Sequence, residues 1–218
     1  MMLSQIFGRR EPERLATRDA YAIWAECYPP WPHNALMEAE QAAVAPILAA
    51  TTPHCALDVG TGSGRYLPLL AATGARLVCG LDFSMPMLAR HRSGRPRVCA
   101  DACRIPFRDA SFDLVSSSLM MGDIPDLAAC IAEFARVLEP GGHLVYSDFH
   151  PSWTAGKWRR TFEGLDGRSF ELAYRPHSIA AHVAQLERRG LDVLAVHQPC
   201  LPGGQTPVVA IVHAVKRP

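Results

Sequence analysis

The sequence lacks the spacing patterns that mark a metal site or a disulfide framework. Its seven cysteines are odd in number and scattered, and several stand inside apolar segments. No C-x-x-C or His-x-x-x-His pattern occurs, and Cys99 with Cys103 has no second pair to complete a four-ligand set. We therefore expect free thiols, no bound metal and a reducing, cytoplasmic location.

An excess of one charge sign and a long apolar run are also missing. The 22 Lys and Arg residues nearly balance 21 Asp and Glu, so the net charge is +1. Such a chain has no basic field for a phosphate backbone, which disfavours a nucleic-acid substrate. The first ten residues hold only a brief apolar stretch before Arg9 and Arg10, so we expect neither a signal peptide nor a membrane span.

The most informative segment that is present covers residues 56–64, with the sequence ALDVGTGSG. An apolar run leads into Asp58 and then into three alternate glycines, Gly60, Gly62 and Gly64. Glycines at this spacing allow a tight turn at the end of a strand, and they expose backbone amides without a Cβ between chain and ligand. The segment therefore predicts a loop against which a ligand lies.

Further apolar runs end in acidic residues. Residues 75–81 predict a second buried strand that ends at Asp82, and the short run 98–100 ends at Asp101. Residues 112–115 open a fourth strand, and a turn at 138–142 leads into a fifth. Strands that alternate with helices and end in acids at one edge predict a doubly wound α/β sheet with its site at the carboxyl rim.

At these blocks the chain resembles a known family, the class I S-adenosylmethionine-dependent methyltransferases, within their methyltransferase type 11 group. The resemblance covers about residues 40–150. It is carried by LDVGTGSG (57–64), GLDFSMPML (80–88), ADACRIPFRDASFDLVSSSLM (100–120) and ARVLEPGGHLVYSD (135–148). It implies a seven-stranded, mostly parallel Rossmann-like sheet whose last strand is antiparallel, and methyl transfer from S-adenosylmethionine to a small-molecule acceptor.

The resemblance also implies which residues bind the cofactor. Asp58 and the three glycines would hold its methionine end, and Asp82 its ribose. The remaining residues assigned to the cofactor are Phe83 and Met87 against the adenine, Asp101 and Ala102 at the adenine amino group, and Ser117. Asp82 has a simpler alternative role, because it stands where it could cap the helix that begins near Ser84.

Two other functions stay open on the sequence alone. A nicotinamide-dependent oxidoreductase shares glycine-rich loops, but here Arg65 and Tyr66 follow the third glycine and the Gly-x-Gly-x-x-Gly pattern is not met. A non-catalytic S-adenosylmethionine-binding protein would keep the same loop. Compared with many relatives, the chain has Gly122 and Asp123 where histidines or an aromatic residue are common. It also lacks the Asn-Pro-Pro-Tyr type motif of enzymes that methylate amide or base nitrogens.

We expect one domain over residues 1–218, with two segments above the rim of the sheet. Residues 11–50 are expected to be helical apart from a break at 28–32, and to form an amino-terminal cap over the core of residues 51–150. In the first helix, at 14–27, Tyr21, Trp24 and Tyr28 share one face. Residues 151–176 predict an inserted β-hairpin, and residues 177–218 the last helix and strands.

The acceptor site is the least determined part. Tyr21, Tyr28 and Arg159 are the residues expected to contact the acceptor, since guanidinium groups suit carboxylates and phosphates. Arg160 is adjacent, and at most one of the two arginines should face the pocket. His150 and His177 are the candidate general bases, needed only if the acceptor is a protonated hydroxyl or a carbon acid. Oxygen, nitrogen, sulfur and carbon acceptors all remain open, as does the oligomeric state.

Overall fold

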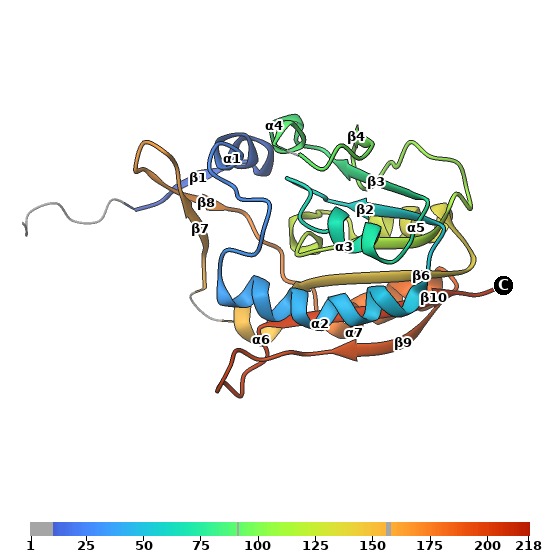
Figure 1. Ribbon diagram of the computed structural model, residues 1–218. Helices are drawn as coiled ribbons and strands as arrows, with labels where there is room; N and C mark the ends of the chain where they lie inside the picture. The colour runs from blue at the N-terminus through green and yellow to red at the C-terminus, as the bar shows by residue number, and fades with distance from the viewer. Residues whose placement is uncertain (1–10, 91, 156–157) are drawn as a thin grey trace, which may run out of the picture.

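The computed structural model describes residues 11–90, 92–155 and 158–218, and a seven-stranded sheet forms its centre (Figure 1). Every strand of this sheet is parallel to its neighbours except β10, which runs antiparallel to both β6 and β9. This is the expected doubly wound α/β sheet. In spatial order the strands are β4 (Arg97–Cys99), β3 (Leu77–Asp82), β2 (Cys55–Val59), β5 (Phe112–Ser117), β6 (Leu138–Phe149), β10 (Val209–Lys216) and β9 (Leu191–His197).

Helices cover both faces of the sheet, and side-chain alternation along the strands divides the core accordingly. On β2, Ala56 packs with the cluster that contains α2 (Ala35–Thr51) and α3 (Leu67–Ala72). The next residue, Leu57, packs with the cluster that contains α5 (Leu127–Val137) and α7 (Ile179–Arg188). Strands buried on both faces read as apolar runs, which is why the sequence predicts them well.

Side-chain caps define where several of the helices begin. The Asn34 side chain accepts a hydrogen bond from the Met37 backbone N–H at 2.9 Å, and α2 starts at the intervening Ala35. Asp126 and Ser178 cap α5 and α7 in the same way, at 3.0 and 3.1 Å. In the part of the chain that is described, no helix is long and apolar enough to cross a membrane.

A second, three-stranded sheet lies beyond the carboxyl ends of the parallel strands (Figure 1). The expected hairpin is present as β7 (Arg160–Glu163) and β8 (Ser169–Leu172). The amino-terminal segment differs from the prediction of a helix over 14–27, because Glu13–Leu15 forms β1, which pairs in parallel with β8. The helix α1 is confined to Thr17–Trp24. A three-residue strand is too short to show a periodicity of its own.

The helix α1 packs on this small sheet through its own apolar cluster. Ala20 is buried against Phe162, Phe170 and Leu172, and the Trp24 ring stacks on that of Phe162 at 4.8 Å between centroids. We call β1, α1, β7 and β8 the cap. Two segments far apart in sequence thus form one unit over the rim. Three short elements connect the rest: α4 (Met85–Ala89), the 3-10 turn η1 (Met121–Asp123) and α6 (Pro151–Thr154).

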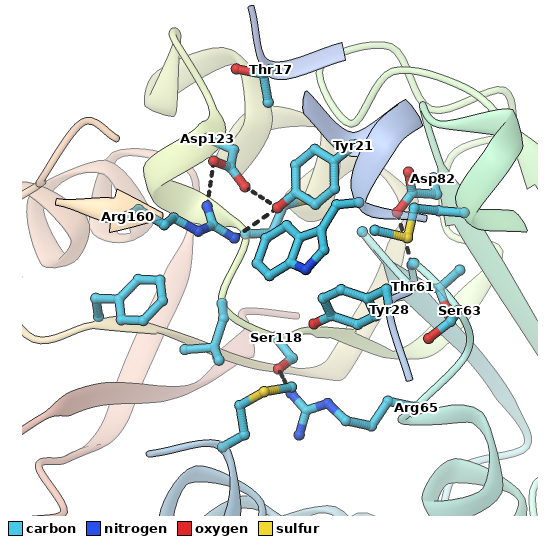
Figure 2. A pocket seen from close by; sticks show the side chains of 18 of the residues that line it. Thr17, Tyr21, Tyr28, Thr61, Ser63, Arg65, Asp82, Ser118, Asp123 and Arg160 are labelled. Atoms are coloured by element: carbon cyan, nitrogen blue, oxygen red, sulfur yellow. Dashed lines mark hydrogen bonds and ion pairs between the residues drawn. The ribbon is translucent and has the colours of Figure 1, made fainter. Parts of the chain in front are cut away.

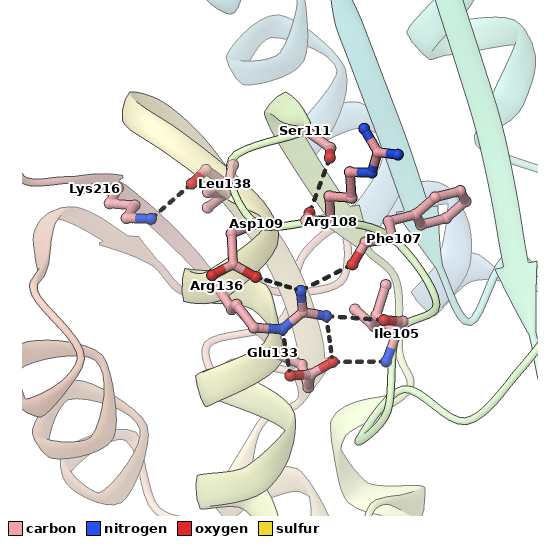
Figure 3. A network of polar contacts seen from close by, with 9 residues as sticks. All are labelled: Ile105, Phe107, Arg108, Asp109, Ser111, Glu133, Arg136, Leu138 and Lys216. Carbon is pink, nitrogen blue, oxygen red and sulfur yellow. Dashed lines mark hydrogen bonds and ion pairs between the residues drawn. The ribbon is translucent and has the colours of Figure 1, made fainter.

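At the opposite end of the sheet from the cap, one arginine holds the loop before β5 (Figure 3). Arg136, near the end of α5, donates to the backbone carbonyls of Ile105 and Phe107 and to the Asp109 carboxylate, each at 2.8 Å. Its remaining bonds go to Glu133, at 2.7 and 2.8 Å, and Glu133 also accepts from the Ile105 N–H. The hydrogen bond from Arg136 lowers the pKa of the Glu133 carboxyl group. All five N–H donors of the guanidinium are therefore used.

Replacing Arg136 by methionine should destabilise the protein by about 2 kcal/mol, because two backbone carbonyls and two carboxylates lose their shared donor. Urea unfolding followed by circular dichroism measures the change. Arg108→Met is the matched control: this side chain is exposed, and Figure 3 shows it pointing away from the network. Equal midpoints for the two variants would contradict a stabilising role for the Arg136 network.

Candidate functional site

A cavity of about 970 Å³ lies between the rim of the large sheet and the cap. This volume is at the upper end of the range of about 300–1,000 Å³ that is usual for small-molecule sites. The rim contributes Asp58, Gly60, Thr61, Gly62, Ser63, Arg65, Tyr66, Asp82, Phe83, Met87, Asp101 and Ala102. The other walls include Arg18, Tyr21, Trp24, Tyr28, Ser118, Asp123, Phe149, Trp153, Trp158 and Arg160.

The glycine loop after β2 is fixed to the end of the neighbouring strand. The backbone N–H groups of Gly60 and Thr61 donate to the Leu81 carbonyl at 2.8 and 3.0 Å. Gly60 and Gly62 both have positive φ, at 72° and 56°. A Cβ on Gly60 would lie 2.5 Å from Met120 Sδ, whereas a Cβ on Gly62 would have no atom within 4 Å. The loop therefore presents open space at Gly62, as a cradle for a ligand requires.

Asp82 holds this loop from the end of β3. One carboxylate oxygen accepts from the Gly62 N–H and the other from the Ser84 N–H, both at 2.8 Å. Ser84 itself caps α4 by accepting from the Met87 N–H, so Asp82 does more than begin that helix. Burial raises the pKa of Asp82 to about 6. An ionised carboxylate at this position gains from any further hydrogen-bond donor that a ligand supplies.

Asp58 occupies the corresponding position on β2. It is 2% exposed and accepts a hydrogen bond from the Ser116 hydroxyl at 2.7 Å. Burial raises its pKa to about 6 as well. Two carboxylates thus end adjacent strands at the cavity, where the rim of a parallel sheet places them.

Four of the remaining residues that we assigned to the cofactor are part of the cavity lining. Phe83, Met87, Asp101 and Ala102 line the cavity beyond Asp82. The Arg18 guanidinium lies 5.3 Å from the Phe83 ring centroid, and the Tyr21 ring meets Phe83 edge-on at 5.9 Å.

Ser117 differs from this set. It is buried beside Met120 Sδ and is not part of the lining, whereas the next residue along the chain, Ser118, is. Successive side chains of an extended chain point to opposite sides, so Ser118, just after β5, faces the cavity where Ser117 does not.

Aromatic side chains form the wall opposite the glycine loop. Tyr21 stacks on Trp24 at 5.9 Å, and Trp24 meets Tyr28 edge-on at 5.0 Å. Tyr28 lies beyond the end of α1, yet its ring joins the same group. Both tyrosines that we expected to contact an acceptor therefore line the cavity.

Three buried polar side chains join the cap to the core (Figure 2). Arg160 donates to one oxygen of Asp123 at 2.6 Å and to the Tyr21 hydroxyl at 2.7 Å. Tyr21 donates to the other oxygen of Asp123, also at 2.6 Å. The side chains of Arg160 and Asp123 are only 10% and 5% exposed. Burial holds the pKa of Tyr21 well above its usual value, so this hydroxyl remains protonated at neutral pH.

Arg159 and Arg160 both line the cavity, but their guanidinium groups have different partners. The Arg159 guanidinium forms ion pairs with Glu11 and Glu171 and is 38% exposed. The Arg160 guanidinium is only 10% exposed and bonds to Asp123 and Tyr21. The expectation that at most one of the two would face the pocket therefore does not hold for the lining as a whole.

The two histidines proposed as general bases lie outside the cavity lining. His150 is held by Ser152 at 2.6 Å and by Gln198 at 2.8 Å, and it caps α6. His177 packs edge-on against His182 at 5.7 Å. Asp148, two residues before His150, accepts from the Tyr174 hydroxyl at 3.2 Å. Asp123 was not among the expected site residues, although the Gly122-Asp123 pair in place of histidine was the available signal.

Residues 57–146 match the family model described as "Methyltransferase domain". The matched segment runs from the glycine loop to β6. The chain is 34% identical over 127 residues to the demethylmenaquinone methyltransferase of Roseiflexus sp. (strain RS-1), covering 51% of this chain and 52% of that protein. The chain thus spans about half the length of the curated relatives it matches.

Solved structures agree with the fold. An S-adenosylmethionine-dependent methyltransferase from Mesorhizobium loti superposes with a TM-score of 0.63 at 25% identity, covering 78% of this chain and 96% of the other. The 1,6-didemethyltoxoflavin-N1-methyltransferase of Burkholderia thailandensis, solved with its toxoflavin precursor and S-adenosylhomocysteine, has a TM-score of 0.59 at 18% identity, covering 92% and 83%. The second likeness shows the fold alone.

Alanine at Gly60 should destabilise the protein more than alanine at Gly62. Both positions have positive φ, which costs roughly 1–2 kcal/mol for a residue with a Cβ. At Gly60 the new methyl group must also displace Met120, adding about 1–3 kcal/mol. Urea unfolding of both variants measures the difference. Equal losses would show that Met120 moves without cost and that Gly60 is constrained by φ alone.

Proposed function

We propose that this chain transfers a methyl group from S-adenosylmethionine to a planar small molecule that carries an ionisable oxygen. One observation carries the proposal. A single cavity joins the open cradle at Gly62 and Asp82 to the buried cluster of Asp123, Tyr21 and Arg160. A cavity with a cradle at one end and a polar cluster at the other has room for a cofactor and an acceptor in contact.

The rim fits the cofactor in several respects. The open space at Gly62 accepts a ligand against the backbone, and Asp82 has lone pairs left for the two ribose hydroxyls. Phe83, Met87, Asp101 and Ala102 line the cavity, and we assign the first two to the adenine ring and the last two to its amino group. S-adenosylmethionine is therefore the cofactor, as the resemblance implies. When bound, it supplies a methyl group on a positively charged sulfur.

The cap meets the two requirements that an in-line displacement places on the protein. Such a reaction needs the two reactants aligned and water excluded. Trp24, Tyr28 and Phe149 line the cavity and enclose the space between the rim and the cap. Aromatic faces also favour a cation, and so suit a sulfonium centre.

The acceptor class follows from the aromatic walls and from Arg160. Two of the five guanidinium N–H groups are used on Asp123 and Tyr21, which leaves donors for an acceptor oxygen. Such contacts favour the anionic form of a phenolic oxygen. An ionised phenol is more nucleophilic at the oxygen and at the adjacent ring carbon, so the same contact serves both kinds of methylation. Hydroquinones belong to this class, in keeping with relatives named demethylmenaquinone methyltransferases.

The proton of the acceptor hydroxyl passes to Asp123 through Tyr21. The protonated Tyr21 hydroxyl donates to Asp123. One lone pair of its oxygen accepts from Arg160, and the other is left for the acceptor. Transfer of the acceptor proton to Tyr21, with the Tyr21 proton moving to Asp123, leaves a neutral carboxylic acid and an acceptor anion beside Arg160. This route replaces the histidine base that we expected and that lies elsewhere.

Calorimetric titration with S-adenosylhomocysteine should show one site with a dissociation constant on the micromolar scale. Asp82→Ala should weaken it by about 30- to 1,000-fold, because charge-assisted bonds to two hydroxyl groups are lost. Gly62→Val should abolish binding while the protein remains folded, since the side chain fills the cradle. Preferential binding of a nicotinamide dinucleotide, or no binding at millimolar S-adenosylhomocysteine, would contradict the cofactor assignment.

Arg160→Gln should lower the turnover of a naphthohydroquinone about 100- to 1,000-fold, the usual loss when a donor to a developing oxyanion is removed. Tyr21→Phe keeps the ring against Phe83 and should lower turnover by at least about tenfold. Product S-adenosylhomocysteine, separated by chromatography, is the readout.

Arg159→Gln is the matched control, because the guanidinium of this neighbour bonds to Glu11 and Glu171 and not to Asp123 or Tyr21. It should keep wild-type turnover, and all three variants should keep their affinity for S-adenosylhomocysteine within a factor of a few. If the Arg159 and Arg160 variants lose turnover equally, the buried cluster is not the acceptor site. If wild type methylates neither hydroquinones nor simple phenols, the acceptor class is wrong.

A further inference from the structure

A second, smaller cavity adjoins the first one beside the buried cluster of Arg160, Tyr21 and Asp123. Its volume is about 460 Å³. The residues that line both cavities are Trp158, Arg159, Arg160 and Arg175. Because Arg160 belongs to both linings, an acceptor held at Arg160 has space for a side arm in the second cavity.

Arginines outnumber carboxylates around this second cavity. Its lining includes four of them, Arg14, Arg159, Arg160 and Arg175, and one acidic residue, Glu171. Glu171 forms ion pairs with both Arg14 and Arg159. Arg159 also pairs with Glu11, and Arg160 with Asp123. Three carboxylates are thus paired with three of the four guanidinium groups.

Arg175 carries the fourth guanidinium, which has no partner in the protein. Among the residues that the structure describes, its side chain makes no hydrogen bond, ion pair or ring contact. All five of its N–H donors are therefore available to a ligand. The planar fork of a guanidinium matches a carboxylate through two parallel hydrogen bonds.

The backbone fixes Arg175 close to the acceptor cluster. Its N–H donates to the Gly122 carbonyl at 2.8 Å, and Asp123 is the residue that follows Gly122. A Cβ on Gly122 would overlap the ring of Tyr174, which occupies that space. Many relatives have a histidine or an aromatic residue at this turn. The glycine of this chain is what admits the segment that carries Arg175.

The wall between the two cavities is aromatic. The Trp158 ring lies 5.1 Å from the ring of Phe149, which lines the first cavity. It lies 5.2 Å from the ring of Tyr174, which lines the second. Methylene groups pack well on such a wall, whereas a charged group needs a partner beyond it. The lining therefore suits a short apolar arm that ends in an anion.

Glu171 favours a carboxylate over a phosphate as that anion. A phosphate monoester carries about −1.5 to −2 charge at pH 7, so the Glu171 carboxylate repels it more strongly than a group with one negative charge. One carboxylate balances the one unpaired guanidinium of the lining.

We propose that Arg175 binds a carboxylate of the acceptor, carried on a short arm that extends from the ring at Arg160 into the second cavity. The preferred acceptor is then a phenolic carboxylic acid rather than a neutral quinol. This proposal rests on the proposed function. Arg175 is a specificity-determining residue, because it contacts the arm and not the reacting oxygen.

The test compares phenolic acids with their neutral amides. The acids are 4-hydroxyphenylacetate, 3-(4-hydroxyphenyl)propionate and 4-(4-hydroxyphenyl)butanoate, which differ in the length of the arm, and each is paired with its primary amide. The methylene groups insulate the phenol, so that acid and amide differ chiefly in the charge at the end of the arm. Formation of S-adenosylhomocysteine is measured for wild type, Arg175→Gln and Arg14→Gln.

Arg14→Gln is the matched control for the loss of one positive charge from the second cavity. The Arg14 guanidinium is paired with Glu171, and Arg14 is not part of the lining of the first cavity.

For at least one arm length, the kcat/KM of wild type should be about tenfold or more higher for the acid than for the amide. Arg175→Gln should lose this preference through a raised KM for the acid, with kcat and both constants for the amide within about threefold. The contact is the same in the ground state and the transition state, so its loss affects KM. Arg14→Gln should keep the preference.

Three results would overturn the proposal. They are equal kcat/KM for acid and amide at every arm length in wild type, an unchanged preference in Arg175→Gln, or an equal loss of preference in Arg14→Gln and Arg175→Gln. In each of these the phenols are still methylated, and the proposed function stands. If wild type methylates no acid and no amide, the proposal falls as well, and turnover of a naphthohydroquinone then shows whether the proposed function falls with it.

Discussion

The buried ion pair between Arg160 and Asp123 is the contact on which the enclosed cavity depends. It joins a strand of the cap to the turn that follows β5, and Tyr21 adds α1 to the same pair. Taking two charges out of water is expensive, and the cost is recovered only when both are fully hydrogen-bonded. The Tyr21 hydroxyl supplies one of these bonds to each partner. Each of the three side chains thus has a hydrogen bond to both of the others.

Two ion pairs of this kind lie at the cavity, and each is neutral as a pair. Arg160 with Asp123 lies toward the cap, and Arg65 with Glu40 lies toward α2. Between them the walls are largely aromatic. The rim adds the carboxylates of Asp58, Asp82 and Asp101, so the two ion pairs supply directed donors but do not set the whole charge of the site.

The sequence predicts the large sheet well and the acceptor end poorly, for physical reasons. Strands such as β2 and β3 are buried on both faces and end in Asp58 and Asp82, so composition alone locates the strands and the rim. Which way Arg159 and Arg160 point depends on the register of a hairpin against β1, a three-residue strand from the other end of the chain. That pairing leaves no periodicity in the sequence.

The cap also contacts two different parts of the cavity wall. Its helix α1 contacts the rim of the large sheet, where Arg18 and Tyr21 lie against Phe83. The same Tyr21 bonds to Asp123, on the turn after β5. A shift of α1 would break both sets of contacts at once, because one short helix carries them. Since β1 and β8 are paired, the hairpin must move with it. The contacts to Phe83 and to Asp123 therefore both depend on the position of the cap.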